Sequence, residues 1–213
     1  QECTKLKREG LYICMIKNPN PVAKNVTPHI RDAEFIREKV PMTKEEIRHV
    51  SICKLHLKSD SVLYDVGSGT GSIAVEAASL SDDMEVYAIE QKENAVQLIT
   101  QNKEKHGLEN IHVINAKAPD GMDNLPVPTH AFIGGSGGNL KEIIEALKAK
   151  NPHIRIVINA ISMETICEIK EILLAYDVKN EDIVQLQVSR SKQIGHYHLM
   201  QAENPVWICS FEF

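Results

Sequence analysis

The sequence predicts a doubly wound, Rossmann-like α/β fold, with a mostly parallel sheet that ends in an antiparallel hairpin. From residue 61 onward, short apolar runs alternate with amphipathic runs of helical period. Such alternation requires parallel strands joined by right-handed crossovers, with helices on both faces of the sheet. After the last helical run come two β-rich runs separated by only a few residues, and a link that short suits a hairpin.

The predicted elements of this region follow from the period of the apolar residues. The strands are 61–66, 85–90, 111–115, 130–133 and 154–159, and the helices are 71–80, 92–106, 138–150 and 162–176. The two runs of the hairpin are 182–190 and 197–212, joined around Gly195. Gly107 stands where a C-cap glycine would end the second of these helices.

The composition changes ahead of this region. Residues 11–16 predict a short strand, and the prolines of the following segment exclude a helix or a central strand there. We therefore divide the chain into an N-terminal strand and Pro-rich linker at 1–28 and a main domain at 29–213. The linker could be the tail of a preceding domain.

Two further helices are predicted at the start of the main domain. Residues 31–38 have the pattern of a short amphipathic helix. Thr43 and Glu46 form a Ser/Thr-x-x-Glu capping box, which predicts a helix that continues to about Leu55.

Bulk properties exclude several classes of function. A net charge of −5 provides no global attraction for nucleic acid. No run of about 18 apolar residues is present, so no membrane span is expected. The five cysteines are scattered without a Cys-x-x-Cys pair, which predicts reduced thiols in a cytoplasmic protein and no metal site.

The segment 61–71 carries the first functional motif, a strand that runs into a glycine loop. The candidate ligand-binding residues of this loop are Asp65, Gly67, Ser68, Gly69, Thr70 and Gly71. Glycine permits a tight turn and a close approach of ligand to backbone, and the helix behind the loop offers free N–H groups. A dinucleotide fingerprint would require Gly-x-Gly-x-x-Gly, but its sixth position is Ser72 here. The spacing therefore favours S-adenosylmethionine.

Glu90 ends the second predicted strand, about 20 residues beyond the glycine loop. An acid at this place accepts hydrogen bonds from ribose hydroxyls, but it is shared with NAD sites and decides little alone. Combined with the loop spacing and the terminal hairpin, it predicts the class I S-adenosylmethionine-dependent methyltransferase fold rather than a dehydrogenase domain.

A second glycine run, 134–138, follows the fourth predicted strand. In open α/β sheets the ligand lies beyond the carboxyl ends of the strands, so Gly135, Ser136 and Gly137 are candidate substrate contacts. The run offers no side-chain base, and an electron-rich carbon acceptor would need none. The alternative is a flexible turn with a helix cap.

Asn159 and Arg190 complete the candidate substrate residues. Asn159 ends the fifth predicted strand. Arg190 would stand at the end of the sixth, where its charge suits a substrate with carboxylates, although a solvated charge at a strand end is an equal alternative.

Several motifs together resemble one family, the decarboxylating precorrin methyltransferases of cobalamin biosynthesis that methylate carbon 15. The motifs are Pro41–Arg48 (PMTKEEIR), Asp65–Ser72 (DVGSGTGS), Ala118–Pro119, Gly134–Gly138 and Asn159–Ala160. The resemblance covers roughly residues 30–210. It implies methyl transfer from S-adenosylmethionine to a precorrin or cobalt-precorrin, with loss of carbon dioxide from the ring C acetate.

The resemblance also implies roles for particular residues. Cofactor contacts would come from Thr43, the loop Gly67–Gly71, Glu90 and the backbone of Ala118, and the macrocycle would face the second glycine run, Asn159 and the Arg190 region. Lys117 departs from the family pattern, where an acid is common, so a side-chain contact to the adenine amino group is in doubt. No catalytic residue is assigned. The family also leads us to expect a homotetramer and a carbon-5 methyltransferase as a fused domain or separate subunit.

Two other hypotheses remain open at this stage. A class I methyltransferase acting on RNA or protein would predict a basic face or an acceptor motif after the fourth strand, and neither is visible. A non-catalytic S-adenosylmethionine-binding subunit would retain the same loop, because the proposed reaction needs no recognisable base.

Overall fold

The structure, a computed structural model, describes residues 17–19 and 29–213. The strand predicted at 11–16 and most of the Pro-rich linker therefore lie outside the described residues. Among the residues described, no helix has the length and apolar character needed to cross a membrane.

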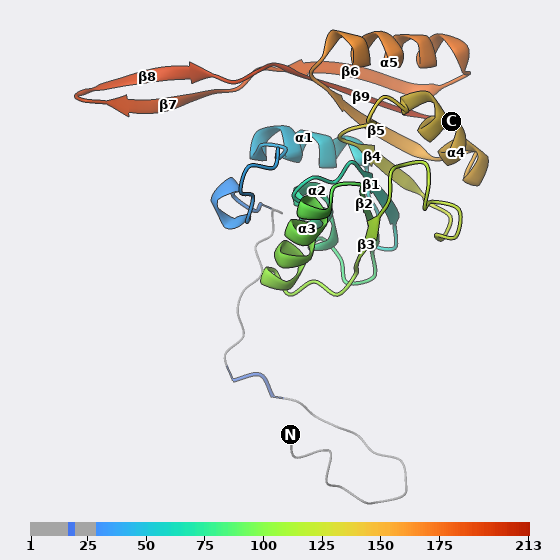
Figure 1. Cartoon of the computed structure of the whole chain (residues 1–213), viewed down its shortest axis with the longest axis horizontal. Coiled ribbons are helices and arrows are strands. Elements are labelled where there is room, and N and C mark those ends of the chain that lie inside the picture. The colour runs from blue at the N-terminus through green and yellow to red at the C-terminus, as the bar shows by residue number, and fades with distance from the viewer. Residues whose placement is uncertain (1–16, 20–28) are drawn as a thin grey trace, which may run out of the picture.

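A seven-stranded sheet forms the centre of the molecule, in the order β3-β2-β1-β4-β5-β9-β6 (Figure 1). The parallel strands are β1 (Val62–Val66), β2 (Glu85–Glu90), β3 (Ile111–Asn115), β4 (His130–Ile133) and β5 (Arg155–Ala160). Strand order reverses between β1 and β4, so their carboxyl ends open a crevice at the topological switch point. All five strand predictions are confirmed.

Helices cover both faces of this sheet, as alternation of strand and helix predicts. They are α1 (Glu45–Leu55), α2 (Ser72–Ala78), α3 (Glu93–Lys105), α4 (Leu140–Lys150) and α5 (Met163–Ala175). One buried cluster joins α1, α2 and α3 to the sheet, and a second joins α4 and α5 to the other face.

The C-terminal hairpin is present but is divided in two. Its inner strands, β6 (Lys179–Leu186) and β9 (Val206–Glu212), continue the main sheet, with β9 antiparallel to both β5 and β6. Its outer strands, β7 (Ser189–Ile194) and β8 (Tyr197–Ala202), form a separate two-stranded arm that extends away from the sheet (Figure 1). The predicted antiparallel hairpin is confirmed, and each of its two runs is divided into two strands.

The helix predicted over 31–38 is wrong. Only a single 3₁₀ turn, Asp32–Glu34, forms there. The buried amide of Asn102 on α3 donates to the Ile36 carbonyl at 2.8 Å and accepts from the Ile36 N–H at 2.8 Å. Because a distant side chain satisfies these backbone groups, they are not available for the hydrogen bonds of a helix.

The capping box predicted at α1 is absent, although the helix itself is confirmed. Its N-cap is Lys44, and no side chain caps it. Arg48, which is fully buried, instead donates to the Thr43 carbonyl at 2.7 Å and forms an ion pair with Glu76 of α2. The start of the helix is therefore fixed by a buried guanidinium, and the Thr43 hydroxyl is not used in capping.

Candidate functional site

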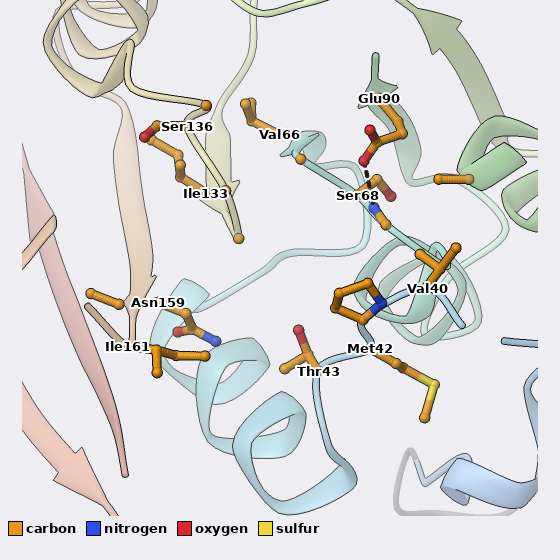
Figure 2. Close-up of a pocket in the computed structure, with 18 of the residues that line it drawn as sticks. Val40, Met42, Thr43, Val66, Ser68, Glu90, Ile133, Ser136, Asn159 and Ile161 are labelled. Atoms are coloured by element: carbon orange, nitrogen blue, oxygen red, sulfur yellow. Dashed lines mark hydrogen bonds between the residues drawn. The ribbon is translucent and has the colours of Figure 1, made fainter. Parts of the chain in front are cut away.

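A cavity of about 790 Å³ lies at the carboxyl ends of the parallel strands. Apolar residues of the sheet form its floor, and the segment 39–43 closes one side against α1 (Figure 2). Its size is in the range of small-molecule sites, and its place at the switch point is the one expected for an open α/β sheet.

The first glycine loop forms one wall of this cavity through Gly67, Ser68 and Gly69. Gly67 has a left-handed φ of +69°, and a Cβ there would lie 2.4 Å from the carbonyl oxygen of Gly135. A Cβ on Gly69 would lie 3.0 Å from the carbonyl oxygen of Pro41. The two glycines thus allow the loop to contact both the second glycine run and the segment that closes the cavity.

Glu90 lies beside this loop, at the end of β2, and is only 8% exposed. Its carboxylate accepts hydrogen bonds from the backbone N–H groups of Gly69 at 3.0 Å, Gln91 at 2.9 Å and Lys92 at 3.0 Å. The bond to Gly69 is drawn in Figure 2. These bonds fix the carboxylate at the cavity wall, and the remaining lone pairs can accept from ligand hydroxyls.

Asp65 lies behind the loop and does not line the cavity. The Ser68 hydroxyl donates to its Oδ2 at 2.6 Å and the Ala74 N–H at 3.2 Å, whereas Oδ1 has no hydrogen-bond partner among the described residues. Burial raises the pKa of Asp65 to about 7, with a smaller contribution from the charge of Glu90. Asp65 therefore supports the loop from within the protein.

The other predicted cofactor residues divide into two groups. Thr43 and Ala118 line the cavity, with the Thr43 hydroxyl directed toward its interior in Figure 2. Thr70 and Gly71 do not line it. Thr70 is 1% exposed and Gly71 is the N-cap of α2, so both act in the turn between the loop and the helix.

The second glycine run faces the first across the cavity. Gly135, Ser136 and Gly137 line it, and Asn159 lines it from the end of β5 (Figure 2). A Cβ on Gly135 would meet no atom within 4 Å, so this glycine borders open space. The structure therefore brings these four predicted substrate residues to the same space as Glu90 and the first loop.

Arg190 is the predicted substrate residue that does not reach the cavity. β6 ends at Leu186, and Arg190 lies in the arm, where its guanidinium is close to several carboxylates. It lies 3.5 Å from Glu45, 3.4 Å from Glu203 and 4.0 Å from Asp32, and it pairs with Glu46. Carboxylates of this chain therefore surround the Arg190 guanidinium, and its role in substrate binding stays a prediction.

Sequence reasoning missed most of the cations that do line the cavity. Lys39, Lys92 and Lys117 line it, and within the described ranges none of them forms an ion pair. The Cε atom of Lys117 lies 3.8 Å from the position that a Cβ on Gly137 would occupy, so this side chain runs beside the second glycine run. Lys92 and Lys117 each stand two residues after the end of a strand, and Lys39 stands two residues before Pro41. These positions are what the sequence offers to find them.

The residues present fit S-adenosylmethionine. A glycine-rich loop borders the cavity, and a Cβ at Gly67 or Gly69 would intrude on neighbouring backbone. The buried Glu90 carboxylate is held at the cavity wall by backbone donors. Gly67–Gly69, Glu90, Thr43 and Ala118 are the residues that would hold it. Across 17–19 and 29–213 no group of three or more His, Cys, Asp or Glu side chains could hold a metal ion.

The raised pKa of Asp65 predicts a pH-dependent contribution to stability. The folded protein retains this proton up to about pH 7, whereas an aspartic acid in the unfolded chain loses it near its ordinary pKa of 3.8. The folded state binds more protons in this interval, so ionisation of Asp65 lowers the free energy of unfolding as pH rises. Asp65→Asn should become more stable relative to wild type from pH 4 to pH 7, by at most about 4 kcal/mol at about 1.4 kcal/mol per pKa unit. Urea unfolding of both proteins without cofactor measures the difference, and a pH-independent difference would contradict this assignment.

Gly67 and Gly135 provide a matched pair of substitutions. Gly67→Ala places a methyl group against the Gly135 backbone at a left-handed φ, so we expect the two loops to separate and S-adenosylmethionine affinity to fall by about tenfold or more. Gly135→Ala places its methyl group in open space and should leave cofactor affinity within about threefold. Isothermal titration calorimetry measures both. Equal affinities for the two variants would show that the loop contact does not shape the cofactor site.

Comparison with known proteins identifies the family. The sequence profile of the precorrin methyltransferase domain matches residues 34–212. A relative from Pyrobaculum calidifontis, named as a probable cobalt-precorrin-6B C(15)-methyltransferase (decarboxylating), is 38% identical over 185 residues, which cover 85% of this chain and 94% of the relative. The crystal structure of a precorrin-6y C5,15-methyltransferase from Geobacter metallireducens superposes with a TM-score of 0.82 at 33% identity, covering 87% of this chain and 97% of that one.

A more distant structure confirms the fold class. An S-adenosylmethionine-dependent O-methyltransferase from Thermotoga maritima superposes with a TM-score of 0.67 at 16% identity, covering 80% of this chain and 66% of that one. The predicted class I methyltransferase fold is confirmed. Since the family profile covers residues 34–212, well over half of the chain, the chain belongs to the precorrin methyltransferase family.

Proposed function

We propose that this chain transfers the methyl group of S-adenosylmethionine to carbon 15 of a precorrin or cobalt-precorrin, with decarboxylation of the ring C acetate, in cobalamin biosynthesis. The observation that carries the proposal is the shared cavity. Two glycine loops face the same space and touch through Gly67 and Gly135, in a chain of the precorrin methyltransferase family. The printed name of the Pyrobaculum calidifontis relative supports carbon 15 and the decarboxylation.

The main requirement of the reaction is that the protein positions the methyl donor and the acceptor carbon. S-adenosylmethionine supplies an electrophilic methyl group, and its transfer is an in-line displacement whose rate depends on how donor and acceptor are held. Glu90 and the first glycine loop would hold the donor side, while Gly135–Gly137 and Asn159 would hold the acceptor. The electron pair released with carbon dioxide passes into the conjugated macrocycle, which then takes up a proton. No separate electron carrier is required.

The charge of the cavity supports a substrate rich in carboxylates. Lys39, Lys92 and Lys117 have no acidic partner among the described residues, whereas the two acids that line the cavity are engaged. Glu90 accepts three backbone hydrogen bonds, and Glu203 pairs with Arg190. Free ammonium groups at a cavity wall attract anionic side chains of a substrate, so these lysines are further candidates for the carboxylate contacts predicted for Arg190.

Turnover of the precorrin tests the proposal directly. The protein is incubated with methyl-labelled S-adenosylmethionine and the carbon-5-methylated precorrin, and both the labelled macrocycle and released carbon dioxide are measured. We expect both products. Cofactor binding without either product would favour the non-catalytic subunit, and label found in RNA or protein instead would favour the alternative acceptor classes.

A matched glycine pair controls this assay. Gly69→Ala crowds the Pro41 carbonyl at the cavity wall, and we expect methyl transfer to fall by about tenfold or more. Gly107→Ala has a similar left-handed φ of +64° but meets no atom within 4 Å, so methyl transfer should persist.

The arm supports self-association, and we extend the proposal to a homotetramer. Ile194, Tyr197 and Leu199 share one face of the arm and are each more than half exposed. A two-stranded ribbon is marginally stable alone, and an exposed apolar face is typical of an interface. The C5,15 name of the Geobacter structure also supports a carbon-5 methyltransferase as partner, and a cytoplasmic location suits such an enzyme.

Light scattering after size-exclusion chromatography tests the role of the arm. Combined Tyr197→Glu and Leu199→Glu substitutions should reduce the mass of the assembly, because like charges would meet across the interface. Gln193→Glu, on the opposite face of the arm, should leave the mass unchanged. A wild-type mass equal to one chain would contradict self-association.

A further inference from the structure

The side chain of Asn102 connects two parts of the cavity wall without reaching the cavity itself. Asn102 lies on α3, is fully buried and does not line the cavity. Its Nδ2 amino group donates to the carbonyl oxygen of Ile36 at 2.8 Å and to that of Thr70 at 2.9 Å. Its Oδ1 atom accepts from the Ile36 N–H at 2.8 Å. Both donors and the acceptor are thus bonded to backbone, and a flipped amide would satisfy none of these contacts.

The two stretches of backbone that this amide joins both lead into the cavity wall. Ile36 stands three residues before the segment 39–43, which lines the cavity. Thr70 follows Gly69, the loop residue whose N–H binds the Glu90 carboxylate. The amide therefore ties the segment that closes the cavity to the loop that borders its acidic residue.

The same two parts of the wall also touch nearer the cavity. A Cβ on Gly69 would lie 3.0 Å from the carbonyl oxygen of Pro41 and 4.0 Å from Cγ1 of Val40. Figure 2 shows Val40 beside this loop. A small shift of either part would therefore change the shape of the cavity where the two meet.

We propose that Asn102 is a positioning residue for the cofactor, which holds the segment 39–43 at a fixed distance from the first glycine loop. The inference rests on the proposed function, because it takes this loop as the site of S-adenosylmethionine. Asn102 acts through the backbone of Ile36 and Thr70 and touches no ligand. Its loss should weaken cofactor binding and leave the chemical step of the bound cofactor nearly unchanged.

The surroundings of Asn102 make this connection rigid. Asn102 is 0% exposed, so water does not compete for its hydrogen bonds. Ile99, on the same face of α3, lies against the end of the loop, because a Cβ on Gly71 would be 3.1 Å from its Cγ2 atom. The helix thus presents a packed surface to the loop, and the amide on that surface fixes where the closing segment lies.

Asn110 provides a matched control for Asn102. Its side-chain amide also donates to backbone carbonyls, those of Ala78 at 3.1 Å, Ser81 at 3.0 Å and Met84 at 2.9 Å. These groups belong to the turn from α2 to β2, at the amino ends of the strands, and do not line the cavity. A change of Asn to Asp at either position replaces a donating amino group with an oxygen that faces carbonyls, so both variants should lose stability.

Calorimetric titration with S-adenosylmethionine and urea unfolding test the inference on the full chain. Asn102→Asp should bind the cofactor about tenfold more weakly than wild type, whereas Asn110→Asp should bind within about twofold, although both unfold at lower urea. In turnover of the carbon-5-methylated precorrin, Asn102→Asp should raise the KM for S-adenosylmethionine by about tenfold and keep kcat within about threefold. Unchanged cofactor affinity in Asn102→Asp, or equal losses of affinity in the two variants, would overturn the inference.

A second measurement uses wild type alone and decides the matter if Asn102→Asp does not fold. If the amide couples the closing segment to the cofactor loop, cofactor binding must in turn stabilise that connection. Hydrogen exchange followed by NMR should therefore show the Ile36 N–H slowed about fivefold or more by saturating S-adenosylmethionine. The Met84 N–H, in the turn held by Asn110, should exchange at an unchanged rate.

The outcomes separate this inference from the proposed function. Unchanged exchange at Ile36, or equal slowing at Ile36 and Met84, would contradict the role of Asn102 even if the protein methylates the precorrin. Cofactor binding without turnover would refute the proposed function, while the affinities and exchange rates would still decide the role of Asn102. A wild-type protein that binds no S-adenosylmethionine would overturn both.

Discussion

The site depends on one close backbone contact, between Gly67 at the end of β1 and Gly135 at the end of β4. Any side chain at Gly67 would overlap the Gly135 carbonyl, so the two loops meet only because Gly67 has none. These strands are neighbours in the sheet and flank the switch point of the topology. The contact therefore joins the loop suited to an adenosyl cofactor to the loop suited to a flat acceptor, and it makes the two halves of the cavity continuous.

Buried polar side chains complete this site by holding segments without regular structure. Arg48 binds the carbonyl of Thr43 and that of Ile30, and the amide of Asn102 binds both backbone groups of Ile36. These bonds fix the chain between residues 30 and 43, whose last part closes the cavity. Because such groups are buried, losing one partner would leave an unsatisfied polar group, and the segment has little freedom to rearrange.

The fold could be predicted because each strand of the main sheet, and each helix that packs on it, has a characteristic spacing of apolar residues in its own sequence. The same holds for the glycine loop, Glu90 and Asn159, which follow strands at the edge where ligands bind. The absence of a helix over 31–38 could not be predicted, because the backbone of Ile36 bonds to Asn102, which is 66 residues away. Likewise, nothing local to Arg190 shows that the arm would carry it into a group of carboxylates, or that Lys39, Lys92 and Lys117 would line the cavity instead.

A crystal structure of the protein with S-adenosylmethionine bound would test the central claim most directly, namely that both glycine loops serve one reaction site. The ribose hydroxyls should lie on the Glu90 carboxylate, and the methyl group should face the space between Gly135 and Asn159. A cofactor bound outside the cavity, or with its methyl group facing away from the second glycine run, would contradict the account.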